Sequence, residues 1–399
     1  MIRVNGRERL DVAMRLGTPD RVPVMCQLAL GHYFLHSGLD AIEVWHDSGA
    51  FAEALVRLQQ RYGFDGILVN LPGRDPDWRR HVRAIEDAAD GRRVIRWTNG
   101  WWTEAPPDDN PHVFREDGQA FHPRFEDVDP ERLYYVEPHD LAGITYPQSW
   151  NLGSEPAPPG SDFFAPWHCD TLRRLVARVG ETVSVQGEVF SPFSQMLELL
   201  DVTNGLMALM DDGGKFKACL EALCAGTIAL ARLQIEAGAR AILVSSAYAG
   251  AGFLSRRQYE EFVLPYERRV IDGLRQWYET PVYTHTCGAI GDRLDLLMTS
   301  GTNGIDTLDP PPLGTVELAE AKRLTAGRVF LKGNLDPVNA LLRGTRDAVV
   351  TAARERIATA GPGGGYVLSS ACSVPPSAPP ENIAVLREVA ETYGRYPLT

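Results

Sequence analysis

Short runs of β-branched and apolar residues alternate with longer segments of helical periodicity along most of this chain, and this alternation limits its fold more than any other feature. Eight of the runs have the length and composition of buried strands. We expect them at 22–26, 64–70, 182–186, 241–244, within 281–288, and at 304–306, 328–331 and 366–369. Eight strand–helix units are the number that closes a (β/α)8 barrel. The sequence therefore predicts an α/β fold of the TIM-barrel type, in one domain over residues 1–399.

A doubly wound open sheet is the competing α/β architecture, because it shows the same alternation. In that fold a glycine-rich fingerprint lies between a strand and the next helix. The glycine-rich segment GPGGGY at 361–366 comes before an expected strand instead. We therefore interpret this segment as a connection and favour the closed barrel.

The alternation stops between residues 74 and 166, after the second expected strand. This stretch is rich in Pro, Asp and Trp, as in WTNGWW (97–102), EAPPDDNP (104–111) and SEPAPPGSD (154–162). Asn99-Gly100 is a strong signal for a two-residue hairpin turn. We predict an inserted loop and hairpin excursion over 74–166 that has no core of its own and covers the active face of the barrel.

Composition places the chain among globular proteins and argues against some partners. Of its 399 residues, 44% are hydrophobic and 23% are charged. The net charge of −12 disfavours nucleic acid or an anionic membrane surface as the main partner. The opening residues lack the apolar core of a secretory signal, and we find no run of about 18 apolar residues that predicts a membrane span. Six scattered cysteines fit a reducing cytoplasm, in which they serve as core residues or metal ligands.

A histidine and a cysteine stand where the fifth expected strand ends. His285 and Cys287 are two residues apart, so in extended backbone they point to the same side. An isolated His-x-Cys pair is weak evidence, since a buried cysteine beside a hydrogen-bonded histidine gives the same pattern. In a barrel, however, the carboxyl ends of all strands meet on one face, and Cys372 follows the eighth strand. Imidazole and thiolate suit Zn²⁺, and three protein ligands with one open position are its catalytic pattern.

Three further residues at the same face are candidates for catalysis. Glu188, at the end of the third strand, is either a fourth, exchangeable zinc ligand or a carboxylate that faces solvent or substrate. Asn334 and Asp336 follow the seventh strand. They either orient substrate and the zinc ligands, or they form an ordinary Asn-x-Asp-Pro turn.

A second group of residues is expected around the cofactor. Asp306 ends the sixth strand and Asp309 lies just beyond it. Both are candidate partners for the other ring nitrogen of His285, because a metal-bound histidine usually donates its second N–H to a carboxylate. Tyr248 is a candidate for the approach to the cofactor. Aromatic residues in such loops more often serve packing, and the same alternative applies to His32, Tyr33, Trp97 and Trp101. We interpret the remaining cysteines, including Cys26 at the end of the first strand, as core residues.

Several motifs resemble those of the uroporphyrinogen decarboxylase superfamily. They are RERLDVAMRLGTPDRVPV (7–24), FVLPYERRV (262–270), HTCG (285–288), KGNLDP (332–337) and ACSVPPSAPPENI (371–383). The resemblance covers most of the chain outside 74–166 and implies a (β/α)8 barrel. Within the superfamily, the chain is most similar to the zinc-dependent methyltransferases that take a methyl group from a methylated corrinoid protein. In those enzymes the HxC pair and the later cysteine bind zinc, which implies this role for His285, Cys287 and Cys372.

Two departures distinguish the chain from the decarboxylases. The decarboxylases carry an arginine-rich segment after the first strand that binds substrate carboxylates, whereas residues 25–31 (MCQLALG) contain no arginine. Their Phe-Asp-Ser-Trp-Ala-Gly stretch appears here as VSSAYAG (244–250), with serine in place of the aspartate. A porphyrinogen with many carboxylates would lack cationic partners, which favours the methyltransferase branch.

The resemblance implies transfer of a methyl group from a methylcobalamin-carrying corrinoid protein to a zinc-activated thiol or to tetrahydrofolate, within a demethylation or one-carbon transfer system. The chain has no Asp-x-His-x-x-Gly segment for corrinoid binding, so we expect the corrinoid on a separate partner. The alternatives are a metal-free decarboxylase or other lyase on the same barrel, and a non-catalytic zinc- or corrinoid-binding component. The methyl donor, the choice between thiol and folate, and the oligomeric state stay open.

Overall fold

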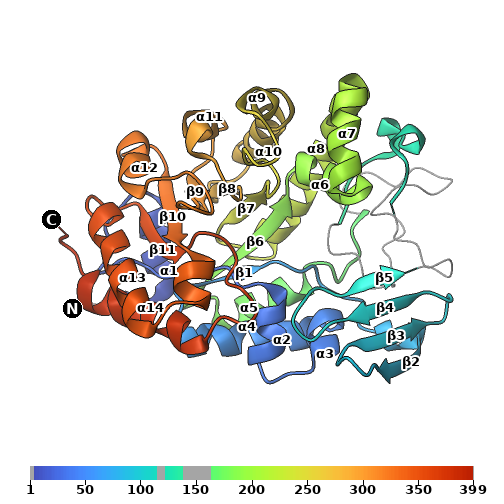
Figure 1. The fold of residues 1–399 in the computed structure, drawn as a ribbon, viewed down its shortest axis with the longest axis horizontal. Coiled ribbons are helices and arrows are strands. Elements are labelled where there is room, and N and C mark those ends of the chain that lie inside the picture. The colour runs from blue at the N-terminus through green and yellow to red at the C-terminus, as the bar shows by residue number, and fades with distance from the viewer. Residues whose placement is uncertain (1–3, 115–121, 138–162, 399) are drawn as a thin grey trace.

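The computed structural model describes residues 4–114, 122–137 and 163–398. Its centre is a parallel sheet of seven strands that curls into a barrel (Figure 1). In sheet order these are β1 (Gly66–Val69), β6 (Ser184–Phe190), β7 (Ile242–Ser245), β8 (Val282–His285), β9 (Gly304–Asp306), β10 (Phe330–Leu335) and β11 (Tyr366–Ser370). The sheet order follows the chain order, as consecutive β-α units require. The predicted TIM-barrel fold is confirmed.

The prediction of a regular strand at 22–26 was wrong. These residues lie between β11 and β1, but they form only isolated backbone contacts. On one side, Leu368 donates its N–H to the carbonyl of Pro23 (2.9 Å). On the other side, the backbone N–H of Asp65 donates to the carbonyl of Val24 (2.8 Å), and the carboxylate of Asp65 accepts the N–H of Val24 (2.8 Å). Proline has no N–H, and a side chain replaces one ladder acceptor. The segment therefore closes the barrel with irregular backbone.

Helices cover the outside of the barrel (Figure 1). The main ones are α4 (Ser48–Tyr62), α5 (Asp170–Val179), α8 (Gly213–Glu236), α10 (Leu264–Arg275), α11 (Leu294–Thr299), α12 (Leu318–Thr325), α13 (Arg346–Ala360) and α14 (Pro380–Tyr393). The other helices are α2 (Leu30–His36), α3 (Ala41–His46), α6 (Pro192–Leu200), α7 (Val202–Asp211) and α9 (Arg256–Phe262), with short 3-10 helices at η1 (Trp78–His81), η2 (Phe125–Asp127), η3 (Pro130–Arg132) and η5 (Gly291–Arg293) and a π-helix at η6 (Pro337–Leu342). Their apolar faces and the outer faces of the strands form one continuous core.

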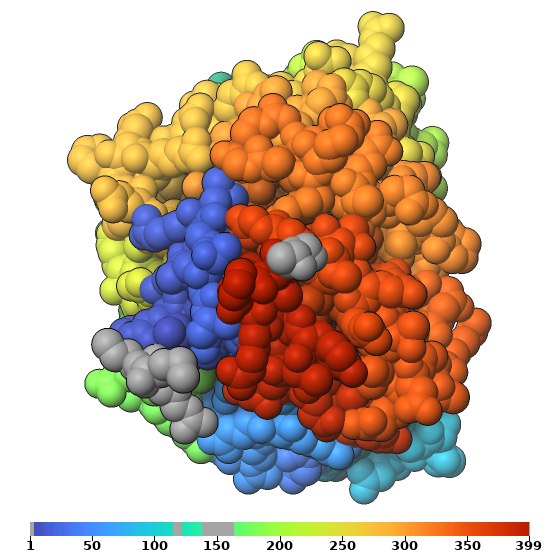
Figure 2. All heavy atoms as spheres, turned by 90° about the vertical axis from the view of Figure 1, so that its left-hand side faces the viewer, coloured from blue at the N-terminus to red at the C-terminus, as the bar shows by residue number. Residues whose placement is uncertain are grey.

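Helix α1 (Gly6–Met14) contributes to the core inside the barrel. Its Leu10, Ala13 and Met14 share a buried cluster with side chains from β1, β7, β8, β10 and β11. The first and last parts of the chain lie side by side (Figure 2), joined by a backbone bridge between Arg21 and Arg395. Apolar residues thus fill one part of the barrel, and the polar residues described below lie in the rest.

The inserted stretch contains more regular structure than expected. It forms an antiparallel sheet of β2 (Val82–Asp87), β3 (Arg93–Trp97), β4 (Trp102–Ala105) and β5 (His112–Phe114) (Figure 1). The predicted hairpin joins β3 to β4, and Gly100 supplies a φ of 88° in its turn. Buried Trp78 and Trp97 pack against Ile42 of α3, so this small sheet shares its apolar cluster with the barrel's own helices. The proline-rich segment 154–162 lies outside the described residues.

Within the described part of the chain, α8 alone is long and apolar enough to cross a membrane by length and composition. The sequence predicted no such segment. Half of the residues in its most apolar window are buried, and the helix packs against α10, α6 and β6. This burial is typical of a core helix.

Candidate metal centre

Three side chains with zinc-binding chemistry meet at the carboxyl end of the barrel. His285 is the last residue of β8, Cys287 lies two residues beyond it, and Cys372 lies two residues beyond the end of β11. Nε2 of His285 is 3.2 Å from Sγ of Cys287, which is 3.2 Å from Sγ of Cys372. One donor atom from each residue lies within 4.8 Å of the other two, and no other such group of three occurs among the described residues. The curl of the sheet brings β8 and β11 together.

A buried carboxylate orients the imidazole from its other side. Asp306 Oδ2 lies 3.2 Å from Nδ1 of His285, and Oγ1 of Thr307 lies 3.1 Å from the same nitrogen. The second carboxylate oxygen, Oδ1, accepts from the ammonium of Lys332 at 2.8 Å. All four side chains are buried. With Nδ1 engaged by Asp306 and Thr307, Nε2 faces the two sulfurs.

The charges in this cluster reinforce one another. Burial acts to raise the pKa of Asp306, but Lys332 and His285 outweigh it and hold that pKa below its usual value. Burial likewise acts to lower the pKa of His285, but hydrogen bonds and charges from Asp306 and Cys372 raise it to about 10. The hydrogen bond between the two thiols lowers the pKa of Cys372 and raises that of Cys287. The sulfur pair thus favours one thiolate, at Cys372.

The other residues expected near the cofactor are placed differently. Asp309 Oδ2 accepts the backbone N–H of Gly288 at 2.6 Å and so anchors the loop after Cys287; no hydrogen bond joins it to His285. Burial raises the pKa of Asp309 to about 6, against the N–H of Gly288. Tyr248 donates its hydroxyl to Glu198 at 2.8 Å, and burial, Glu198 and the charge of Cys287 all raise the pKa of Tyr248. The hydroxyl of Tyr248 is thus held by Glu198.

Asp336 and Asn334, the two candidates after the seventh expected strand, lie in different environments. Asp336 caps the turn η6, where Oδ1 accepts the N–H groups of Val338 (2.8 Å) and Asn339 (2.7 Å). This is the role expected of an ordinary Asn-x-Asp-Pro turn. Asn334 donates Nδ2 to the carbonyl of Leu308 at 2.9 Å, while its buried Oδ1 has no hydrogen-bond partner among the described residues.

Glu188 lies on the inner side of β6, outside the group of three donor atoms. Burial raises the pKa of this carboxyl to about 7, against the charges of His285 and Lys332 and a hydrogen bond from Ser245. The position of Glu188 is compatible with either interpretation drawn from the sequence.

The aromatic residues considered for the approach serve packing. His32 shares a hydrogen bond of 2.7 Å with the hydroxyl of Tyr62, and Tyr33 makes an edge contact with Phe51. Trp97 is buried in the small sheet and donates to Thr103, and Trp101 packs on the same cluster. Cys26 is buried as expected, and its sulfur accepts the N–H of Ser370.

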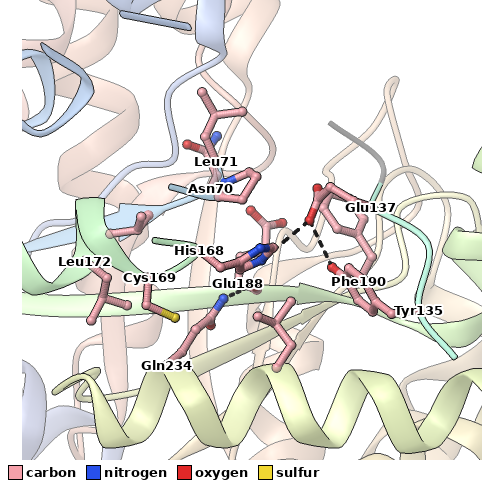
Figure 3. Close-up of a pocket in the computed structure, with 13 residues that line it drawn as sticks. Asn70, Leu71, Tyr135, Glu137, His168, Cys169, Leu172, Glu188, Phe190 and Gln234 are labelled. Atoms are coloured by element: carbon pink, nitrogen blue, oxygen red, sulfur yellow. Dashed lines mark hydrogen bonds and ion pairs between the residues drawn. The ribbon is translucent and has the colours of Figure 1, made fainter. Parts of the chain in front are cut away.

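Residues that sequence reasoning missed include Lys332, Thr307 and two side chains of a cavity beside Glu188 (Figure 3). In that cavity, Oε2 of Glu137 lies 4.0 Å from Nε2 of His168. A lysine within the apolar strand FLKGNL was a usable signal, because register pairs Lys332 with Asp306. Glu137 and His168 come from irregular segments, where no periodicity predicts the direction of a side chain.

Comparison with known proteins gives consistent matches. The family model for Uroporphyrinogen decarboxylase (URO-D) matches residues 151–393, more than half of the chain. A Uroporphyrinogen decarboxylase of Thioalkalivibrio sulfidiphilus is 34% identical over 189 residues, which are 47% of this chain and 51% of the relative. One of Nitrosomonas europaea is 35% identical over 158 residues, 39% of this chain and 42% of the relative. The chain thus spans about half the length of the curated relatives that it matches.

Among solved structures, a methyltransferase from Methanosarcina mazei has a TM-score of 0.69 and 17% sequence identity. The similarity covers 98% of this chain and 99% of that one. At this identity the likeness shows a shared fold. The family match begins at residue 151, so the motif at 7–24 lies outside it.

Proposed function

Since the chain belongs to the uroporphyrinogen decarboxylase (URO-D) family, we propose that it is a zinc-dependent methyltransferase on the barrel of that family. It moves a methyl group from a methylated corrinoid protein to a thiol or to tetrahydrofolate. The observation that carries this proposal is the meeting of His285, Cys287 and Cys372 within 4.8 Å. Catalytic zinc sites use three protein ligands of this kind and leave one position for substrate.

The donor set fits zinc in chemistry as well as in number. Two sulfurs and an imidazole are ligand types that zinc prefers, and the imidazole of His285 is oriented by Asp306 and Thr307, as in other zinc sites. Bound to these residues, zinc would supply a Lewis acid that lowers the pKa of an acceptor thiol, so that its thiolate is available at neutral pH.

The chain's own residues orient and balance this site. Asp306 holds the imidazole, and Lys332 compensates the charge of Asp306 inside the barrel. The acceptor sulfur attacks the methyl carbon, so that the carbon–sulfur bond forms as the carbon–cobalt bond breaks and its electron pair stays on cobalt as Co(I). Glu188 is the candidate fourth ligand or, as the alternative, the carboxylate that takes up the thiol proton at its Oε atoms. We assign Asn334 to substrate orientation, because its Oδ1 has no partner among the described residues.

The proposal includes a partner and a location. The corrinoid arrives on a separate protein, and the reaction takes place in the cytoplasm. All six cysteines are free, as thiols are in a reducing compartment.

Decarboxylation of a tetrapyrrole is the second candidate function, favoured by the names of the relatives at 34–35% identity. Such a substrate carries several carboxylates and needs cations. The segment 25–31 carries none, and Lys332 is buried against Asp306. The charges near the barrel mouth therefore support methyl transfer more than this alternative.

Metal analysis coupled to a methylcobalamin assay tests the proposal. We expect about one zinc per chain, the stoichiometry of a single catalytic site, and demethylation of methylcobalamin with a thiol or tetrahydrofolate. Cys372→Ser should lose the zinc and the activity together. Cys224→Ser is the matched control, because that buried thiol bonds to the carbonyl of Leu220 one helical turn earlier, a contact that serine can keep. A zinc-free protein that decarboxylates a tetrapyrrole would establish the rival function instead.

A further inference from the structure

The loop that follows Cys372 is rich in proline. Residues 373–379 read SVPPSAP, and Pro375 and Pro376 have no backbone N–H to donate. The backbone of these two residues can therefore be held only by donors that reach their carbonyl oxygens. Because Cys372 lies directly before this loop, the contacts of the loop affect the position of its sulfur.

Helix α2 supplies donors to both carbonyl groups. Nδ1 of His32 lies 3.1 Å from the carbonyl oxygen of Pro375 and 3.0 Å from that of Pro376. Nε2 of His36 lies 3.0 Å from the carbonyl oxygen of Pro376. A carbonyl oxygen can only accept a hydrogen bond, so each of these two ring nitrogens carries a proton and donates it. The two imidazoles therefore hold the proline pair from one side.

The second nitrogen of His32 fixes the direction of its ring. Nε2 lies 2.7 Å from the hydroxyl of Tyr62 on α4. His32 is 0% exposed, and burial lowers its pKa to about 4, so the ring is neutral at physiological pH. In a neutral ring with the proton on Nδ1, Nε2 accepts the hydroxyl hydrogen of Tyr62. Both nitrogens of this buried ring are thus engaged.

Backbone hydrogen bonds extend the same contact toward Cys372. The N–H of Ala29 donates to the carbonyl of Val374 at 3.1 Å, and the N–H of Val374 donates to the carbonyl of Gln27 at 2.9 Å. Val374 lies two residues after Cys372. Segment 27–36 therefore holds the chain that leaves Cys372, on the side away from β11.

We propose that His32 and His36 are positioning residues of the candidate metal centre. They act through the loop 373–376 and keep the sulfur of Cys372 within the group of three donor atoms. The inference rests on the metal site of the proposed function, and it gives two imidazoles outside that site a role that the sequence did not predict.

The two sulfurs are held by different contacts, which gives the proposal a specific consequence. Cys287 is followed by Gly288, whose N–H is accepted by Asp309 at 2.6 Å. Loss of the donors on α2 should therefore release Cys372 and leave Cys287 in place. A general loosening of the fold would affect both thiols alike.

Alkylation of the metal-free protein tests this consequence without a bound ion. Iodoacetamide modifies accessible thiols, and mass spectrometry of the peptides gives separate rates for Cys372 and Cys287. We expect His32→Phe to raise the ratio of the Cys372 rate to the Cys287 rate by about three- to tenfold, the equilibrium effect of losing one hydrogen bond. His32→Asn should restore the ratio, because its Nδ2 can donate from the place of Nδ1.

A second variant and a matched control complete the set. His36→Leu removes the other donor at a half-buried position and should also raise the ratio, which keeps the test open if His32→Phe does not fold. His46→Phe is the control, since His46 is 2% exposed and its ring contacts Trp78 and Trp97. Its ratio should equal that of the wild type.

Cobalt(II) in place of zinc gives a spectroscopic readout, because sulfur ligands produce a charge-transfer absorption that grows with their number. His32→Phe should lower this absorption per bound cobalt toward the value of Cys372→Ser. It should also weaken metal binding about tenfold, the lower end of the cost of losing a residue that supports a metal ligand. His32→Asn should restore both the absorption and the affinity.

The alkylation ratio separates this inference from the proposed function. An unchanged ratio in both His32→Phe and His36→Leu would overturn the inference and leave the proposed function standing, and so would an equal rise in His46→Phe. Absence of zinc and of methyl transfer in the unmodified protein would overturn the proposed function. The ratio in the metal-free protein would still decide whether the two imidazoles hold Cys372.

Discussion

Asp306 divides its two carboxylate oxygens between a cation and the imidazole of a candidate zinc ligand. One oxygen accepts from Lys332 at 2.8 Å, and the other lies 3.2 Å from His285. Because all three side chains are buried, none of these charges is well screened by water. Asp306 therefore both pairs with a buried cation and orients the imidazole of the candidate zinc ligand.

Asp306→Asn should weaken zinc binding by about 10- to 100-fold, the usual cost of losing a hydrogen-bond partner of a metal-bound histidine. Competition with a chromophoric chelator measures the affinity. Asp87→Asn is the control, since the Asp87 side chain is 86% exposed and should leave the affinity unchanged. Equal affinities in both variants would show that Asp306 does not support the site.

Lys332→Met should destabilise the protein by about 3–5 kcal/mol, because it leaves the buried charge of Asp306 without its cation. Urea unfolding measures the change. Combining Lys332→Met with Asp306→Asn should recover most of this loss while zinc binding stays weak. Additive losses in the double variant would contradict a direct interaction between the two side chains.

At the scale of elements, the loops after the strands place the two sulfurs. The loop after β7 supports the loop after β8, where Gly250 lies against the carbonyl of Cys287; a Cβ at residue 250 would stand 2.3 Å from that oxygen. Asp309 holds the same loop from the other side through Gly288. The position of Cys287 thus depends on backbone contacts with two neighbouring segments.

Gly250→Ala should displace the loop that carries Cys287 and reduce zinc occupancy, because the new methyl group cannot fit beside the carbonyl. Gly252→Ala lies in the same loop with nothing within 4 Å of the added carbon and should keep full occupancy. Zinc per chain after dialysis distinguishes the two variants. Full occupancy in Gly250→Ala would mean that the loop adjusts without cost to the site.

A buried carboxyl joins α10 to the end of β7. Glu267 accepts the hydroxyl of Ser246 at 2.5 Å and that of Tyr259 at 2.7 Å. Burial raises its pKa above the usual 4.5, although both hydroxyl groups oppose the rise. The native state therefore keeps this proton to a higher pH than the unfolded state does, and the stability contributed by this group falls as pH rises through the raised pKa.

Glu267→Gln removes this titration. The free energy of unfolding of the wild type minus that of the variant should therefore decrease as pH rises from the usual carboxyl pKa of 4.5 through the raised pKa of Glu267. Urea unfolding of both proteins across this range measures the difference. Parallel pH profiles for the two proteins would show that Glu267 does not titrate in the window.

At the scale of the whole molecule, the small sheet meets the barrel near the segment that carries Cys372. The loop between β4 and β5 packs on α2, where a Cβ on Gly31 would lie 2.0 Å from the carbonyl of Asp108 and 3.0 Å from Pro376. Pro376 follows Cys372 by four residues. The inserted stretch is thus tied to the edge of the candidate site.

Gly31→Val should loosen the contact between the small sheet and α2, because the larger side chain clashes with the backbone of Asp108. Limited proteolysis should then cut the loop 106–111 faster than in the wild type. Gly252→Ala again serves as the control with unchanged cleavage. Unaltered cleavage in Gly31→Val would argue against a tight contact at this point.

The sequence by itself determined the barrel and the strand ends at which His285, Cys287 and Cys372 lie. These features follow from local rules: residue types repeat with the period of strands and helices, and parallel strands end on one face. The same rules wrongly predicted a regular strand at 22–26. Pro23 has no N–H to donate, and the side chain of Asp65 accepts the N–H of Val24 in place of a backbone carbonyl.

The tertiary structure alone decided which side chains share a small volume. Lys332 on β10 donates to Asp306 on the neighbouring strand β9. Asp336 caps the turn η6. Glu137 lies 4.0 Å from His168, and both come from segments without regular periodicity. Distances between residues far apart in the chain depend on strand register, loop path and packing, which the periodicity of a single segment does not contain.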